Sequence, residues 1–461
     1  MSTILRVEDF AALRDRLDGR LVEPGHESWD EARAAWNLTA DLRPAAVVVA
    51  ASAEDIAETV RFAADRGYGV TAQGTGHGAA ALESRLDGVI LIKTHELRGV
   101  EIDPETRTAR VQAGALWMDV TVPAHEHGLA ALAGSSPDVG VVGYTLGGGL
   151  SWLSRTYGVA ANSVTAIEVA TADGQIIRTD ADNDPALFWA LRGGGGGFGI
   201  VTAIEFTLYP VSEVYAGVMF WPIDRAAEML HAWHDLVPSL PEAMTTVGRL
   251  LMLPPIPEIP EPLRGRKFVV VEAIHLGDER EGAELLAPLR RLAPEMDTVA
   301  TIPAPALSAL HMDPEHPVPG AGDGMLLSDL EPGSIDEIAG LGMSGALDAL
   351  LSVELRQLGG AIGRPTPGQG AVGHFDAAYA MFAVGIAPVP PAKQAVLAAV
   401  GTVIAALEQH RANTGYINFH ERPADPATVY PTTVHRRLAE LKRWYDPTDV
   451  IRSNHPIAPA M

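Results

Sequence analysis

The stretch QGTGHGAA (73–80) places one histidine, His77, among closely spaced glycines directly after the apolar run GYGVTA. Glycines in such a loop allow positive φ, and they let a ligand reach main-chain N–H groups without a Cβ in the way. A diphosphate needs this kind of approach. The histidine adds an imidazole, whose neutral form is a competent nucleophile near pH 7. The loop therefore predicts a phosphate-binding turn with a reactive nitrogen beside it.

A Rossmann dinucleotide site is one interpretation of this loop, because G-T-G-H-G-A follows a predicted strand and fits the G-x-G-x-x-A form. A Rossmann loop opens a long crossover helix, whereas residues 82–88 leave only about two turns before the next strand, VILIK (89–93). Glu96 lies at a plausible sequence distance for a ribose contact, but it follows that strand in a polar turn. The spacing disfavours a Rossmann site.

Two further glycine-rich segments follow in the chain. They are GSSPDVGVVGYTLGGGLSWLSRTYG (134–158) and GGGGGFGIVT (193–202). Few side chains in these segments could obstruct a ligand. Three such segments within one predicted domain indicate a long ligand that lies against main chain over much of its length, and FAD is such a ligand.

The composition of the 461 residues excludes several functions. Cysteine is absent, which removes disulfides, thiolate catalysis and cysteine-ligated metal. The net charge of −24 disfavours nucleic acid and anionic membranes as partners. The start of the chain shows no secretory pattern, and no apolar run is long enough to span a bilayer. The sequence thus predicts a cytoplasmic protein, either monomer or homodimer, with a small-molecule substrate.

The chain is predicted to have four parts: an N-terminal helical lead-in (1–41), a first domain (42–210), a second domain (211–410) and a C-terminal segment (411–461) that returns to the first domain. In the first domain, PAAVVVAAS (44–52) predicts a strand and residues 53–66 predict a helix. Ser52 is its expected N-cap, with Glu54 and Asp55 in the first turn. The strand after this helix delivers the glycine loop.

Taken together, the motifs resemble the berberine-bridge-enzyme-like oxidases of the vanillyl-alcohol oxidase/p-cresol methylhydroxylase flavoprotein superfamily. The resemblance covers residues 42–210 and 414–457. It rests on motifs in the same order: GTGHG, GSSPDVGVVGYTLGGGLSWL, VATADG, DPALFWALRGGGGGFGIVTAIEFTLYP, and YINF with LAELKRWYDPTDVIRSNHPI. It implies an α+β fold, with a two-part FAD-binding domain of the p-cresol methylhydroxylase type closed by the C-terminal segment, and an α/β substrate domain with an antiparallel sheet.

The resemblance also implies which residues bind the cofactor. His77 matches the histidine that is joined covalently to the 8α-methyl carbon of the flavin. A cysteine often forms a second bond in this family, and the matching place here holds serines, so double attachment is excluded. The implied FAD-binding residues are Gln73, Gly74, Thr75, Gly76, His77, Gly78, Ala79, Ser135, Ser136, Gly140, Gly143, Thr145, Gly147, Gly148, Gly149, Ile200, Val201, Tyr416 and Asn418.

Catalysis in such enzymes requires hydride delivery to flavin N5 while a base removes a proton from the substrate. Tyr416 is expected to be this base or an orienting acid, with Asn418 on the same face of a strand. Tyr144 and Tyr379 are the other catalytic candidates, although core packing is the favoured role for Tyr379. The expected enzyme is an FAD-dependent oxidase of an alcohol, phenol or secondary metabolite that yields hydrogen peroxide. A dehydrogenase with another acceptor, or a non-catalytic flavin-binding protein, is the alternative.

Other polar groups are weaker candidates. His231 and His234 have a spacing that can hold a metal ion, but no third ligand is near in sequence, so no metal site is predicted. Asp313, Glu315 and His316 lie in a proline-bounded loop, where we expect them to meet solvent.

Overall fold

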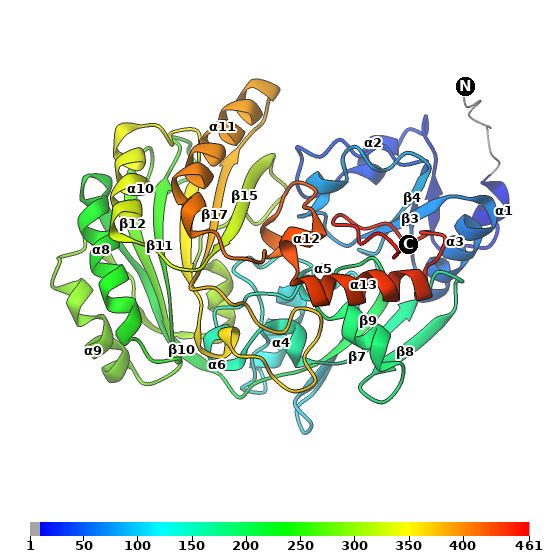
Figure 1. The fold of residues 1–461 in the computed structure, drawn as a ribbon, viewed down its shortest axis with the longest axis horizontal. Coiled ribbons are helices and arrows are strands. Elements are labelled where there is room, and N and C mark those ends of the chain that lie inside the picture. Colours follow the sequence, from blue (N-terminus) through cyan, green and yellow to red (C-terminus); the bar gives the residue numbers. More distant parts are fainter. Residues whose placement is uncertain (1–9, 461) are drawn as a thin grey trace.

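The computed structural model describes residues 10–460 and arranges them around three β-sheets (Figure 1). Residues 1–9 of the predicted lead-in lie outside the described residues. The rest of the lead-in contains the short helices α1 (Ala11–Arg14) and α2 (Trp29–Arg33), and also the strand β1 (Arg20–Val22). β1 pairs with the sheet that follows it in the chain, so the lead-in is not wholly helical as predicted.

A four-stranded sheet presents the glycine loop. Its strand order is β1-β2-β4-β3, with β2 (Ala46–Val49), β4 (Val89–Lys93) and β3 (Gly69–Gln73) parallel to one another. Between β2 and β3 runs α3 (Ala53–Arg66), whose capping box joins Ser52 to Asp55. The predicted strand–helix–strand unit is confirmed. The loop then enters only a short 3-10 turn, η1 (Ala79–Leu82), which agrees with the rejection of a Rossmann crossover.

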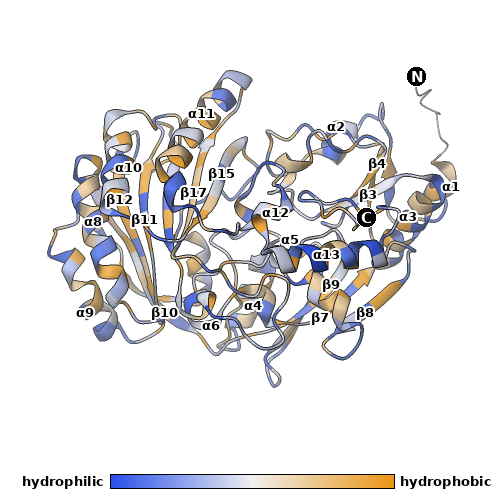
Figure 2. Cartoon of the chain, in the orientation of Figure 1, coloured by the Kyte–Doolittle hydropathy of each residue, from blue (hydrophilic) through white to orange (hydrophobic). Residues whose placement is uncertain are grey.

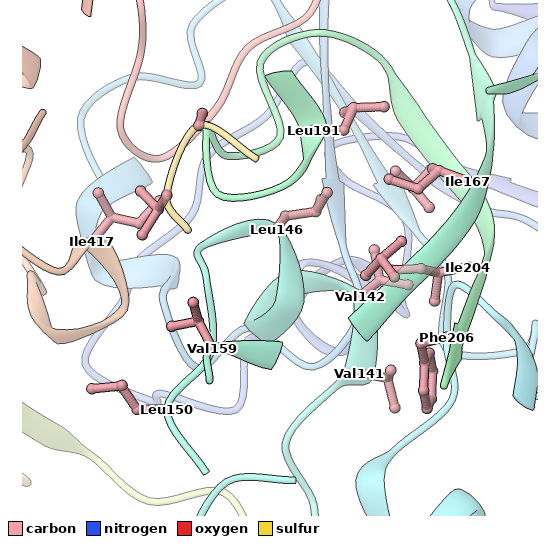
Figure 3. Close-up of a cluster of buried hydrophobic side chains, with 14 of the residues drawn as sticks. Val141, Val142, Leu146, Leu150, Val159, Ile167, Leu191, Ile204, Phe206 and Ile417 are labelled. Carbon is pink, nitrogen blue, oxygen red and sulfur yellow. The ribbon is translucent and has the colours of Figure 1, made fainter. Parts of the chain in front are cut away.

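A five-stranded antiparallel sheet lies next along the chain. Its order is β5-β6-β9-β7-β8: β5 (Val100–Asp103), β6 (Thr108–Gln112), β9 (Ile200–Thr207), β7 (Val164–Ala170) and β8 (Ile176–Asp180). The helices associated with it are α4 (Trp117–His125), α5 (Val141–Leu146), α6 (Ser154–Tyr157) and α7 (Pro185–Leu191). Apolar side chains of α5 face those of β7 and β9, and Ile417 reaches the same core from the C-terminal segment (Figure 3).

An eight-stranded antiparallel sheet makes up the other half of the molecule. Its main order is β13-β10-β12-β11-β16-β17-β15, and β14 also pairs with β10. The strands are β10 (Glu213–Pro222), β11 (Met244–Met252), β12 (Lys267–His275), β13 (Met296–Asp297), β14 (Ala300–Pro303), β15 (Gly320–Leu327), β16 (Ser352–Gln357) and β17 (Tyr379–Ile386).

Four helices cover one face of the eight-stranded sheet: α8 (Ala226–Leu236), α9 (Glu279–Arg290), α10 (Pro332–Ser344) and α11 (Pro390–Leu407) (Figure 1). Apolar residues run along the strands beneath them (Figure 2). The segment 390–410 is long and apolar enough to cross a membrane by length and composition, a test that core helices also pass. α11 packs its buried residues against this sheet. The opposite face of the sheet packs in part against the 3-10 helix η5 (Ala304–Ala309) and Trp152, and this is the face that contributes to the site described below.

The C-terminal segment packs on the first half of the chain through α12 (Pro426–Val429) and α13 (Thr432–Tyr445). α13 contacts α7, and Ile451 forms a parallel bridge to Val70 in β3. Lys442 is buried, and its ammonium donates to the carbonyls of Gly197 and Ile451 and to the carboxylate of Asp446. One side chain therefore joins the third glycine-rich segment to the end of the chain. The predicted boundaries at 42, 211 and 411 stay predictions.

Candidate functional site

The glycine loop holds His77 in a fixed orientation. Its ring stacks on Trp36, with ring centroids 4.0 Å apart, and its Nδ1 lies 2.8 Å from the hydroxyl of Thr75. Its Nε2 is buried, has no hydrogen-bond partner, and lies 3.7 Å from a carboxylate oxygen of Asp138. One ring nitrogen is therefore held by the protein, and the other is free to react.

The main chain of this loop offers a row of free donors. Within residues 10–460, no protein acceptor is paired with the N–H groups of Thr75, Gly76, His77 or Gly78. Of the loop glycines only Gly76 has a positive φ, at 95°, and a Cβ there would also meet Ala35 and Gln73, so both backbone and space require glycine. Gln73 and Ala79, at the two ends of the loop, are buried. Unpaired N–H groups in succession form a cradle for an anion such as a diphosphate.

The second glycine-rich segment lies against this loop. Asp138 faces His77, and Gly140 lies against the side chain of Thr75. The Trp36 indole donates to the second oxygen of Asp138. Burial alone would raise the pKa of the Asp138 carboxyl, but His77 and Trp36 more than offset this effect and hold the pKa below its usual range. An anionic carboxylate is therefore fixed beside the free nitrogen of His77.

α5 connects this region to the triple glycine 147–149. Gly140 is its N-cap, Gly143 is exposed with nothing within 4 Å of an added Cβ, and Thr145 is buried with its hydroxyl bonded inside the helix. The Tyr144 hydroxyl donates to the carbonyl of Leu132, and burial raises the pKa of Tyr144 well above its usual value.

Tyr416 and Asn418 lie next to the triple glycine, but not in a strand as predicted. Asn418 lies in a 3-10 turn, η8 (Ile417–Phe419), and Tyr416 is its N-cap; the carbonyls of Tyr416 and Ile417 accept hydrogen bonds within this turn rather than from a neighbouring strand. Asn418 donates to the Tyr416 oxygen over 3.0 Å and to the carbonyl of Tyr144 over 2.9 Å. A Cβ on Gly147 would overlap the Asn418 amide, so glycine is required for this approach.

The remaining predicted residues lie elsewhere. Tyr379 packs against Trp233 in the core beneath the helices of the eight-stranded sheet, so its catalytic assignment is not supported. Ile200 and Val201 are buried in β9. In the third glycine-rich segment, a Cβ on Gly193 or Gly194 would meet Val372 or Ala190. Close packing of protein against protein, rather than ligand contact, explains glycine at these two positions.

Six charged side chains form a cluster that motif analysis missed, and we call it the charged cluster. Its members are Arg249, Glu272, His311, Asp313, Glu354 and Arg356. His311 lies between two buried carboxylates, 2.8 Å from Glu272 and 2.7 Å from Glu354. Arg249 pairs with Glu272 at 3.1 Å, and Arg356 with Glu354 at 3.1 Å.

The charged cluster meets the second glycine-rich segment. Ser136 donates to Asp313 over 2.5 Å, and Ser135 bonds to both Asp313 and Arg356. Asp313 is therefore half-buried against protein groups rather than directed only at solvent, whereas Glu315 and His316 of the same loop are exposed as expected. The signal that could have revealed the cluster is the alternation in β16. Val353 and Leu355 enter the helix-covered core, while Glu354 and Arg356 point to the other face.

The charge on His311 makes stability depend on pH. Burial and Arg249 disfavour its imidazolium, but Glu272, Asp313 and Glu354 outweigh them and raise the pKa of His311 from 6.5 to about 9. The folded protein therefore holds a proton that the unfolded chain releases. We expect this contribution to be complete below pH 6.5 and lost as the pH rises through 9. A shift of this size corresponds to about 3 kcal/mol.

Urea unfolding between pH 6.5 and 9.5 measures this contribution. The wild-type free energy of unfolding should fall more steeply with pH than that of His311→Asn, which has no imidazole to titrate. Equal slopes in the two proteins would show that His311 is not charged in the folded state.

Comparison with known proteins agrees with this geometry. Residues 44–180 match the family model described as an FAD binding domain. The "Uncharacterized FAD-linked oxidoreductase YvdP" of Bacillus subtilis (strain 168) is 30% identical over 313 residues, which cover 67% of each chain. The chain belongs to the FAD-linked oxidoreductases. The (R)-6-hydroxynicotine oxidase of Paenarthrobacter nicotinovorans is 28% identical over 466 residues, covering 96% of this chain and 97% of the relative.

The fold of this FAD-linked oxidoreductase is also found in solved structures. Wild-type BBE-like 1 of Physcomitrella patens superposes with a TM-score of 0.85 at 18% identity, over 98% of this chain and 100% of that one. The predicted fold class, the p-cresol methylhydroxylase type, and the resemblance to berberine-bridge-enzyme-like proteins are confirmed. The residues present fit FAD, because the loop 75–78 combines a row of unpaired N–H groups with a His77 nitrogen that has no hydrogen-bond partner.

Proposed function

We propose that this FAD-linked oxidoreductase is an oxidase that acts on an alcohol, a phenol-type compound or another secondary metabolite. The substrate loses two electrons and two hydrogens, and dioxygen takes them up as hydrogen peroxide. Bound FAD supplies the two-electron chemistry for this exchange. The relative that aligns over 96% of this chain, the (R)-6-hydroxynicotine oxidase, is an oxidase, which supports the choice of dioxygen as acceptor.

The observation that carries the proposal is the setting of Tyr416. Its oxygen accepts hydrogen bonds from the N–H of Leu150 over 3.1 Å and from Asn418 over 3.0 Å. Burial raises the pKa of Tyr416 to about 12, although Asn418, the Leu150 N–H and the Arg356 charge lower it in part. Tyr416 is therefore protonated near neutral pH, with its own O–H left to donate. This supports a role as the acid that orients the substrate oxygen.

The cofactor would be held by three groups of residues. The unpaired N–H groups of 75–78 would bind the diphosphate, and the segment 135–149 would line the rest of the path. His77 would form a covalent bond to the flavin 8α carbon. That bond replaces one imidazole N–H hydrogen and one methyl hydrogen, and two electrons pass to dioxygen as hydrogen peroxide. The free Nε2 of His77 beside Asp138 supports this attachment.

Purified protein tests the function directly. We expect flavin absorbance, and release of peroxide when alcohols, phenols, sugars and polyketides are screened in air. On any active compound, Tyr416→Phe should lower kcat by about 100-fold or more, as expected for loss of a positioned acid. Tyr209→Phe, in an aromatic contact with Tyr157 away from Tyr416, is the matched control.

Two outcomes would contradict the proposal. Colourless folded protein that takes up no added FAD would overturn it entirely. Substrate-dependent reduction of a dye without oxygen consumption would instead identify a dehydrogenase. The cytoplasmic location, the absence of a membrane partner and the monomeric or homodimeric state stay predictions from the sequence.

A further inference from the structure

The carboxylates of Glu272 and Glu354 are engaged inside the charged cluster. Glu272 accepts from Arg249 at one oxygen and contacts His311 at the other. Both oxygens of Glu354 are engaged, one by His311 and Arg356 and the other by the Arg356 Nε. The Asp313 carboxylate accepts from Ser135 and Ser136. A positively charged ligand would have to displace these internal bonds from Glu272 and Glu354.

Arg356 and Arg249 each have a terminal nitrogen with no paired acceptor within residues 10–460, but Arg249 is enclosed, at 3% exposure. The Arg356 Nη2 contacts Ser135, Glu354 and His311, its Nη1 has no paired acceptor, and its buried Nε has no hydrogen-bond partner. An arginine has five N–H donors, so an unused terminal nitrogen can bind an oxygen from a ligand. The side chain is 14% exposed, in contrast to the fully enclosed Glu272.

Aromatic rings surround this guanidinium. Its carbon lies 5.5 Å from the ring of Trp152 and 5.4 Å from that of Phe419. Phe419 in turn contacts Phe382 and Tyr416, each with ring centroids 4.9 Å apart. This setting fits a flat, apolar ring on the ligand, with its polar oxygen directed at the arginine.

Arg356 also belongs to the same site as the proposed acid. Ser135, which it contacts, lies in the second glycine-rich segment, and Phe419 follows Tyr416 in the same turn. A ligand held between Arg356 and Tyr416 would therefore lie between the eight-stranded sheet and the glycine-rich segments.

We propose that Arg356 is a specificity-determining residue, and that it binds the carboxylate of an aromatic substrate. This inference rests on the proposed function, since it assigns the substrate class of that site. Glu354 and His311 act as positioning residues. The Glu354 carboxylate pairs with the Arg356 guanidinium, and His311 contacts the same carboxylate.

Titration of the flavin-containing protein with three probes of similar size tests the inference. Benzoate, benzamide and benzylamine share a ring but carry an anionic, a neutral and a cationic group at pH 7. Flavin absorbance and calorimetry report binding independently. We expect benzoate to bind at least about 10-fold more tightly than the other two, as a charge-assisted bond predicts.

Variants assign this preference to Arg356. Arg356→Met should raise the Kd for benzoate at least about 10-fold, and Arg356→Lys should recover part of the loss because it keeps the charge. Arg364→Met, which removes an exposed arginine paired with Glu242, is the matched control and should leave the Kd unchanged.

The inference is overturned if benzamide or benzylamine binds as tightly as benzoate in the wild-type protein, a result that needs no variant to fold. It is also overturned if Arg356→Met and Arg364→Met give the same Kd. Flavin content, measured first, tests the proposed function separately. Were flavin absent, calorimetry would still decide whether benzoate binding depends on Arg356.

Discussion

Lys442→Met is expected to lower the free energy of unfolding by about 3–5 kcal/mol, the cost of leaving a buried charge without its partner. The ammonium bonds to Asp446 over 2.6 Å and to the carbonyls of Gly197 and Ile451 over 2.8 and 2.7 Å. Methionine has a similar length but no donor. The variant would leave the Asp446 carboxylate and two buried carbonyls without this donor.

Denaturant unfolding of four proteins measures the effect: wild type, Lys442→Met, Asp446→Asn and the double variant. Because the two charges satisfy each other, the double variant should lose less stability than the sum of the singles. Arg443→Met changes the exposed neighbouring residue and should be nearly neutral. If Lys442→Met is equally neutral, the ammonium does not tie the C-terminal segment to the glycine-rich run.

Local patterns predicted the elements that deliver the glycine loop. The strand–helix–strand unit around α3 has its capping box at Ser52, and Gly67 ends the helix in the left-handed conformation, as short-range rules require. Here the information is local, so a single sequence is sufficient. The fold class was implied by the family resemblance that the ordered motifs carry over residues 42–210 and 414–457.

The charged cluster could not be predicted in the same way. Its members come from β11, β12, β16 and the loop before β15, and they meet only once the eight-stranded sheet has formed. Asp313 is the clearest case. Its proline-rich surroundings favour a solvent-exposed loop, whereas the folded chain places it against Ser136. Only tertiary packing decides such contacts.

Tyr416 and Asn418 show a second limit of structure prediction from the sequence. The Y-x-N spacing correctly predicted that Tyr416 and Asn418 lie together, although Asn418 lies in a 3-10 turn capped by Tyr416 rather than in a strand. The proximity survives because the Asn418 amide is also held by the carbonyl of Tyr144. Tyr144 and Asn418 are 274 positions apart in the sequence, so no local pattern specifies this hydrogen bond.

Loss of the proposed covalent bond between His77 and the flavin is the second change with a large expected effect. Flavin in the wild-type protein is expected to stay with the protein after acid precipitation, whereas His77→Ala should release all of it, because only a covalent bond survives unfolding. His127→Ala, which changes an exposed histidine, is the matched control and should retain the flavin. Absorbance of pellet and supernatant measures the result.

Substitution of Asp138, next to His77, is expected to have a smaller effect on flavin attachment than substitution of His77 itself. Asp138 lies 3.7 Å from the reactive nitrogen, and Thr75 holds the other nitrogen over 2.8 Å. We expect Asp138→Asn to slow attachment without preventing it, because the imidazole stays stacked on Trp36 but loses the adjacent carboxylate that can accept its proton. Free flavin released from wild-type protein would remove the covalent proposal and leave FAD binding intact. Equal attachment rates in wild type and Asp138→Asn would remove only the role of Asp138.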